Sequence, residues 1–123
     1  MSTVTFVAPP PGLDPLTRFS LTSIDGADGL YALRSLERED SRLFLLDPYH
    51  YIPGYAPEFT DQQCAQLELT RPEDAAVFVV ATHRDGRTTA NLLAPIVVNT
   101  TLDRCAQFIL EGQDWPLQAE LKP

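Results

Sequence analysis

Lysine is almost absent from this sequence, and positive charge is scarce as a whole. The 123 residues carry 17 acidic side chains against nine basic ones, of which only Lys122 is a lysine, so the formal charge is −8. Such a charge repels phosphate, and no run of basic residues offsets it. We therefore expect no direct binding of nucleic acid. A basic protein partner would complement this charge, because opposite fields accelerate encounter; plain solubility is the alternative explanation.

Cysteines and long apolar runs are also few. Cys64 and Cys105 are far apart and show no CxxC spacing, so we expect two free thiols rather than a disulfide. No stretch approaches the roughly 20 apolar residues of a membrane span. The first residues lack the basic segment and the apolar core of a secretion signal, which predicts a cytoplasmic protein without a membrane partner.

Groups that could converge on a reacting atom are sparse. His50 and His83 have no partner at metal-ligand spacing. Gly26 and Gly29 stand beside aspartates that would repel a phosphate group. No serine lies in a nucleophile-elbow pattern. We therefore expect no catalytic residue, cofactor or metal; an enzyme built on a small barrel stays a rival interpretation, because fold alone does not decide function.

Short strand patterns dominate the chain. Asp85-Gly86 predicts a tight hairpin between Ala76–Thr82 and a strand from about Thr88, in which Pro95 limits pairing near the middle. The apolar run Leu43–Leu46 suits a strand buried on both faces. About seven strands predict a mainly β protein: a small antiparallel barrel-like single domain, monomeric alone because a closed barrel lacks free edges. The other expected strands cover residues 3–7, 18–22, 30–34 and 105–110.

One short helix is expected at about residues 61–69. Thr60 can cap its N-terminus, and Gln63 stands three residues later, which is the spacing of a capping box. Asp61 suits the positive end of the helix dipole. Pro72 ends the segment.

Tyrosines gather in one proline-stiffened loop. Tyr49, Tyr51 and Tyr55 fall within seven positions and follow the pair Asp47-Pro48. Tyrosine offers a large contact area at low entropic cost and keeps a polar tip. The loop therefore suits a protein-binding surface, while capping of the open end of the barrel is an equal alternative.

Several motifs, in register along the chain, resemble the FliW family. The residues Asn91–Asn99, NLLAPIVVN, are close to that family's core motif N-L-x-A-P-I-V-I-N. The chain departs from the family near its end, where Trp115-Pro116-Leu117-Gln118 stands in place of a Tyr-Pro pair followed by a basic residue. Shorter matches lie at residues 11–13, 43–48, 55–57, 72–74 and 107–110.

The resemblance implies a function without catalysis. FliW-family proteins bind the RNA-binding translational regulator CsrA, away from its RNA surface, and also bind flagellin. Export of flagellin frees the factor, which then binds CsrA and lifts the repression of flagellin translation. The family fold is described as a small antiparallel β-barrel. For this chain we expect CsrA and flagellin as partners, with a dedicated flagellin chaperone acting without CsrA as the alternative. The contact candidates are Asp47, Tyr49, Tyr51, Tyr55 and Asn91.

Overall fold

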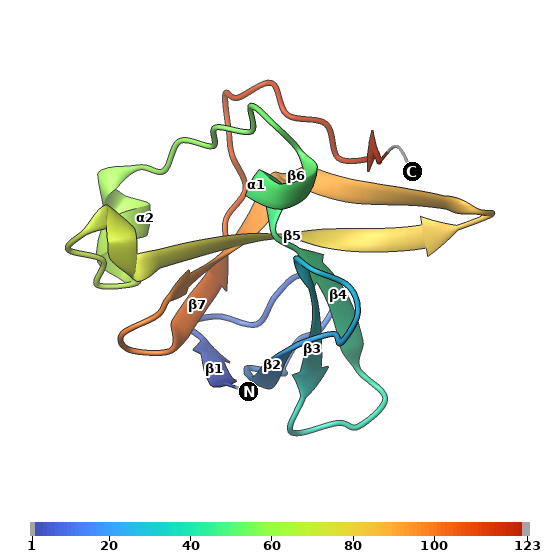
Figure 1. The fold of residues 1–123 in the computed structure, drawn as a ribbon. Helices are drawn as coiled ribbons and strands as arrows, with labels where there is room; N and C mark the ends of the chain where they lie inside the picture. Colours follow the sequence, from blue (N-terminus) through green and yellow to red (C-terminus); the bar gives the residue numbers. More distant parts are fainter. Residues whose placement is uncertain (1, 122–123) are drawn as a thin grey trace.

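The computed structural model describes residues 2–121, so Lys122 lies outside the described part. Seven strands close into a ring in the order β5-β4-β3-β2-β1-β7-β6, with β6 paired back onto β5 and β8 added to β6 outside the ring (Figure 1). The predicted mainly β, barrel-like fold is confirmed. The elements are β1 (Ser2–Phe6), β2 (Arg18–Ser23), β3 (Leu30–Ser35), β4 (Arg42–Leu46), α1 (Pro48–Tyr51), α2 (Asp61–Gln66), the 3₁₀ turn η1 (Pro72–Asp74), β5 (Ala75–Arg84), β6 (Arg87–Asn99), β7 (Arg104–Gln107) and β8 (Ala119–Glu120).

One seam of the barrel is parallel, which the prediction of an antiparallel barrel did not include. β1 runs parallel to β7, with Phe6 opposite Cys105, whereas every other strand pair is antiparallel. An odd number of strands cannot alternate in direction all the way around a closed ring. The ring therefore needs at least one parallel pair, and it falls where the first strand meets β7.

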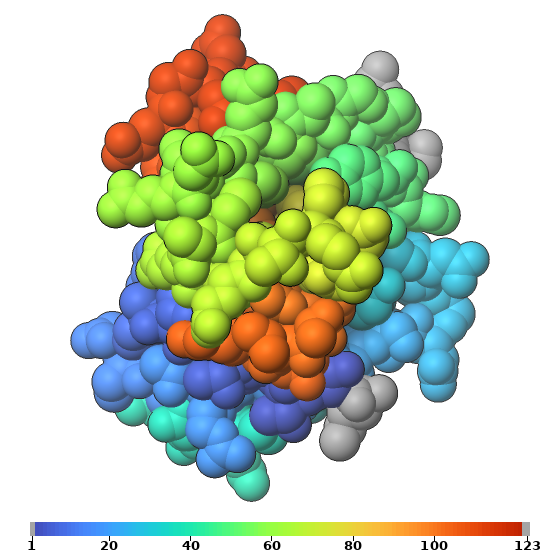
Figure 2. Space-filling view, turned by 90° about the vertical axis from the view of Figure 1, so that its left-hand side faces the viewer, coloured from blue at the N-terminus to red at the C-terminus, as the bar shows by residue number. Residues whose placement is uncertain are grey.

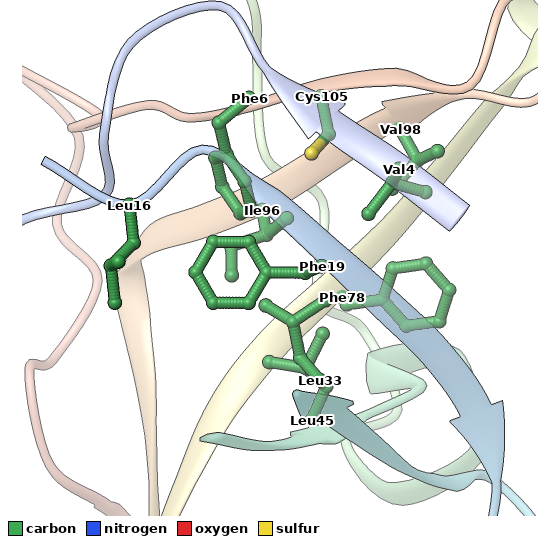
Figure 3. Close-up of a cluster of buried hydrophobic side chains, with 10 residues drawn as sticks. All are labelled: Val4, Phe6, Leu16, Phe19, Leu33, Leu45, Phe78, Ile96, Val98 and Cys105. Atoms are coloured by element: carbon green, nitrogen blue, oxygen red, sulfur yellow. The ribbon is translucent and has the colours of Figure 1, made fainter. Parts of the chain in front are cut away.

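The barrel interior is an apolar core built from alternating positions of the strands (Figure 3). Phe19 is fully buried, and the edge of its ring meets the Phe6 ring at a centroid distance of 5.3 Å. Burial of these side chains is the main stabilising contribution to the ring. The remaining members of this core are Val4, Leu16, Leu33, Leu45, Phe78, Ile96, Val98 and Cys105.

A hairpin arm, the outer part of β5 and β6, extends beyond the ring (Figure 1). Asp85 and Gly86 form its turn with φ values of 54° and 75°, as the Asp-Gly pair predicts. β4 pairs with β5 only as far as Ala81, so residues 82–84 have no strand on that side in the described part of the chain. The expectation of a barrel without a free edge is therefore wrong at the arm.

A wide bulge separates the arm from the ring. Between the pairs Val80–Asn91 and Phe78–Ile96 the register shifts, so that residues 92–95 stand opposite Val79 alone. Pro95 lies in this bulge, which confirms that it limits pairing near the middle of β6. Each bulge carbonyl has a donor elsewhere: Leu92 O accepts from the Tyr55 hydroxyl at 2.6 Å, Leu93 O from Leu110 N at 2.8 Å, Ala94 O from Gln107 Nε2 at 3.0 Å, and Pro95 O from Phe108 N at 3.0 Å.

A second apolar cluster packs on the outer face of the sheet, next to the bulge. Leu45 points into the barrel core, so its neighbour Leu46 points outward, together with the cross-strand residue Val79. The chain after α1 and the C-terminal segment cover part of this cluster. It consists of Leu46, Tyr55, Val79, Ala90 and Leu92, with Leu30, Ile52, Val77, Ala81, Trp115, Ala119 and Leu121 packed around them.

The predicted helix exists but is shorter than residues 61–69. The capping box is confirmed, because Thr60 N donates to Gln63 Oε1 at 2.9 Å and Gln63 N donates to Thr60 Oγ1 at 3.0 Å. The helix ends at Gln66 because Glu68 takes a left-handed φ of 55°, and Leu69 N returns to Cys64 O at 2.9 Å. Figure 2 faces the flank on which α2 lies between the C-terminal segment and the N-terminal strands.

Three other local predictions need correction. A second helix, α1, forms within the predicted tyrosine loop. β4 is not buried on both faces, because Phe44 keeps 40% of its surface exposed. The last predicted strand ends at Gln107, since beyond it Phe108 N and Leu110 N bond to Pro95 O and Leu93 O in the irregular bulge of β6. Among residues 2–121, no helix has the length and apolar character needed to cross a membrane.

Candidate functional site

The tyrosine loop is organised by the single helical turn α1. Asp47 caps this turn, because its Oδ1 accepts from Tyr49 N at 3.0 Å and Pro48 fits the first helical position. The turn is seated on the β2–β3 loop, where the Tyr51 hydroxyl donates to Asp28 O at 2.6 Å. Gly29, at φ +79°, lies so close that a Cβ there would approach Tyr51 Cε2 to 2.9 Å. The loop is therefore held in one place on the protein surface.

The three tyrosines of the loop have different environments. Tyr49 is 60% exposed and Tyr51 is 36% exposed, whereas Tyr55 is 4% exposed. Partial burial raises the pKa of Tyr49, and the neighbouring Asp47 carboxylate raises it further. Tyr49 and Tyr51 can meet a partner directly, so the prediction of an accessible aromatic surface fits these two residues.

Tyr55 belongs to the outer apolar cluster, and its expected exposure is wrong. Its hydroxyl donates to the bulge carbonyl Leu92 O at 2.6 Å, and its ring meets the Trp115 ring edge-on at 4.8 Å. Burial raises the pKa of this phenol above its ordinary value. Pro116 O also accepts from Leu92 N at 3.0 Å. The departure from the family pattern at Trp115 thus falls at a packing contact of the C-terminal segment.

Asn91 shapes the bulge. Its Oδ1 accepts from Leu93 N and Ala94 N, both at 3.1 Å. The side chain borders a hollow that Arg84 and Leu117 also line, apart from the hollows that hold Tyr49 and Tyr51. The structure therefore does not bring Asn91 into one patch with the α1 tyrosines, and its contact with a partner stays a prediction.

Two hollows flank α1, one beside each exposed tyrosine. The arm groove, about 630 Å³, lies between α1, β4 and the hairpin arm. The α2 groove, about 420 Å³, lies between α1 and the chain from Phe59 to Ala75. Tyr51 lines the arm groove with Leu30, Phe44, Leu46, Ala81, Arg87 and Glu120. Tyr49 lines the α2 groove with Phe59, Cys64, Leu69, Arg71, Val77 and Val97.

Neither groove was predicted from the sequence, because each collects residues from distant segments. One signal was present: the apolar run of β4 places Phe44 next to Leu45, so that Phe44 faces away from the barrel core, where it keeps 40% of its surface exposed. Arg42 lies over that ring at 4.8 Å from its centroid. The groove lining is apolar with a few charged groups, which is the usual character of a recognition surface.

Among residues 2–121, titratable groups do not converge on either groove in a reactive arrangement. His83 Nδ1 bonds to Thr88 Oγ1 at 2.8 Å, and His50 packs edge-on against Tyr51 at 4.8 Å. Both cysteines are free, as predicted; Cys105 is buried, and this burial raises the pKa of its thiol to about 12, so the thiol stays protonated. Residues 2–121 contain no cluster of three or more His, Cys, Asp or Glu side chains able to hold a metal ion.

Comparisons with known proteins agree on one family. The model of the FliW protein family matches residues 1–121. The chain is 31% identical to the flagellar assembly factor FliW of Thermosipho africanus, covering 96% of this chain and 83% of that protein. It is 32% identical to the protein of the same name from Moorella thermoacetica, covering 90% of this chain and 72% of that protein.

A solved structure gives the same answer for the fold. The crystal structure of a flagellar assembly factor FliW superposes with a TM-score of 0.92 at 30% sequence identity, covering 98% of this chain and 86% of that chain. The family model and the relatives span nearly all of the described barrel, arm and C-terminal segment. The chain therefore belongs to the FliW family.

Proposed function

We propose that this protein is a non-catalytic, cytoplasmic flagellar assembly factor that binds the translational regulator CsrA and flagellin in a partner-switching cycle. The observation that carries the proposal is α1, a fixed turn that presents the exposed Tyr49 and Tyr51 between two apolar grooves. Large aromatic side chains on a pre-organised element are favourable anchors for a protein partner, because little flexibility is lost on binding.

The α2 groove suits the regulator. CsrA binds RNA, and RNA-binding proteins carry an excess of positive charge. The segment 61–74 that borders this groove carries four carboxylates and one arginine. Two of the carboxylates are already paired, Asp74 with Arg71 at 3.2 Å and Glu68 with Arg104, which leaves Asp61 and Glu73. The remaining negative charge of this segment would attract a basic partner and steer its approach.

The two partners would exclude one another at α1. A stable protein interface covers roughly 800 Å² on each partner, which is wider than either groove alone. Both grooves border α1, so a protein seated on one side would extend across the helix toward the other. This arrangement would let flagellin and CsrA compete without sharing every contact.

Replacement of Tyr49 by alanine tests the proposal. We expect Tyr49→Ala to weaken CsrA binding roughly ten- to a hundredfold, because loss of an anchoring ring removes on the order of 1.5–3 kcal/mol of apolar burial. Isothermal titration calorimetry measures the affinity. Tyr49→Phe should retain most of this affinity, and Leu36→Ala, which truncates an exposed apolar side chain outside both grooves, should leave it unchanged. Wild-type affinity in Tyr49→Ala would contradict the role of α1.

A further inference from the structure

The arm groove continues the outer apolar cluster to a part of the surface that residues 2–121 leave open. Leu30, Leu46, Ala81 and Leu121 belong to that cluster and also line the groove. The Tyr55 segment and the C-terminal chain cover the cluster at one end, but Phe44 and Tyr51 remain 40% and 36% exposed at the other. A large apolar surface left open beside a packed cluster favours an interaction site.

Positive charge borders this groove. Arg87 lines it, and Arg42 lies over the ring of Phe44, which also lines it. Neither arginine forms a salt bridge with any residue between 2 and 121. One carboxylate, that of Glu120, also lines the groove, so the rim as a whole has an excess of positive charge in a strongly acidic protein.

The wall of the groove offers backbone as well as side chains. β5 pairs with β4 no further than Ala81, so residues 82–84 form an edge free of any described strand, and His83 on this edge lines the groove. A free edge of this kind accepts an extended peptide by strand addition, with alternate side chains of the peptide pointing to one face. The geometry therefore fits an extended segment better than a helix.

We propose that the arm groove receives an extended segment of flagellin whose apolar side chains pack on Phe44 and Leu30 and whose carboxylates meet Arg87 and Arg42. This inference rests on the proposed function, and it assigns flagellin, one of the two proposed partners, to the arm groove. The charge of the groove rim favours flagellin over CsrA. An RNA-binding regulator carries the same sign of charge as this rim and would be repelled by it, whereas the acidic segment 61–74 lies on the other side of α1.

Charge reversal and truncation in the groove test the assignment. Arg87→Glu and Phe44→Ala should each weaken flagellin binding tenfold or more, because one removes a charge-assisted contact and the other an aromatic surface. CsrA affinity should stay within about twofold of wild type, since these residues lie outside the α2 groove. Both affinities are measured by isothermal titration calorimetry with the flagellin and the CsrA of the source organism.

Matched controls separate the groove from general charge and packing effects. Arg38→Glu makes the same charge change in the β3–β4 loop, and Leu36→Ala truncates an apolar side chain that is 49% exposed; neither residue lines a groove, so both should retain flagellin affinity. Arg87 is exposed at the arm, so Arg87→Glu remains informative even if Phe44→Ala folds poorly.

The two measured affinities separate the possible outcomes. The assignment is supported if the groove variants lose flagellin affinity while the control variants keep it. Unchanged flagellin affinity in a well-folded Arg87→Glu overturns it, and loss of CsrA affinity instead assigns the groove to the regulator and overturns it as well. If the wild-type protein binds no flagellin, the proposed function fails together with this inference. If the wild-type protein binds flagellin and the groove variants bind it equally well, only the inference is overturned.

Discussion

Replacing Tyr55 by alanine should lower the free energy of unfolding by about 3–5 kcal/mol, the usual cost of deleting a buried aromatic ring. The ring fills the outer apolar cluster against Trp115, and the hydroxyl satisfies Leu92 O in the bulge. Without the Tyr55 ring, the C-terminal segment loses the aromatic contact of Trp115. Urea denaturation followed by circular dichroism measures the change.

The conservative variant separates the two contributions of Tyr55. Tyr55→Phe keeps the ring and removes only the donor to Leu92 O, so we expect a smaller loss, on the order of 1–2 kcal/mol. A change of less than about 1 kcal/mol in Tyr55→Ala would contradict the view that Tyr55 holds the C-terminal segment and the bulge together.

Replacing Asn99 by aspartate should also destabilise the fold strongly, by about 3 kcal/mol or more at neutral pH. Asn99 is 2% exposed, and its Nδ2 donates to Leu67 O at 2.8 Å, at the end of α2. Its Oδ1 accepts from Thr101 N at 3.0 Å and from Leu102 N at 3.2 Å. A carboxylate keeps the two acceptor bonds but replaces the donor by a buried negative charge that faces a carbonyl oxygen.

The effect of Asn99→Asp should depend on pH with a defined sign. Burial beside a carbonyl raises the folded-state pKa of the introduced carboxyl above its unfolded value, so its ionisation opposes folding. The loss of unfolding free energy relative to wild type should therefore be largest above the folded-state pKa. It should shrink as the pH falls through that pKa. Urea unfolding of both proteins at several pH values measures this difference. A deficit that grows on acidification, or no deficit at pH 7, would contradict the role assigned to Asn99.

Local features of the fold could be predicted from the sequence, because short-range rules decide them. The Asp85-Gly86 turn follows from the tolerance of these residues for positive φ. The capping box at Thr60 follows from a three-residue spacing. Pro95 interrupts pairing because it has no N–H to donate. Each prediction needed only neighbours in the chain.

Long-range features could not be predicted, because closure of the barrel decides them. The parallel seam between β1 and β7 arises only when seven strands close into a ring. Tyr49, Tyr51 and Tyr55 look equivalent in the sequence, yet only Tyr55 meets the bulge carbonyl and Trp115. Asn91 was expected at a partner contact, which stays a prediction, but its bonds to the backbone of the bulge could not be foreseen. Both grooves depend in the same way on segments far apart in the chain.

The exposed aromatic part of the candidate site lies at α1 and the grooves on its two sides. Asp47 contributes as the cap of α1, and Tyr49 and Tyr51 contribute as its exposed rings. Tyr55 and Asn91 contribute to the frame that holds the arm and the C-terminal segment in place. Variants of the first three residues should alter partner affinity, and variants of the last two should alter stability first.

The most direct test of the central claim is a displacement titration, in which flagellin is added to a preformed complex of this protein with CsrA. The proposed cycle predicts that each partner binds the free protein and that flagellin releases CsrA in proportion to the amount added. A stable ternary complex with unchanged affinity for CsrA, or failure of either partner to bind the free protein, would contradict the partner-switching function.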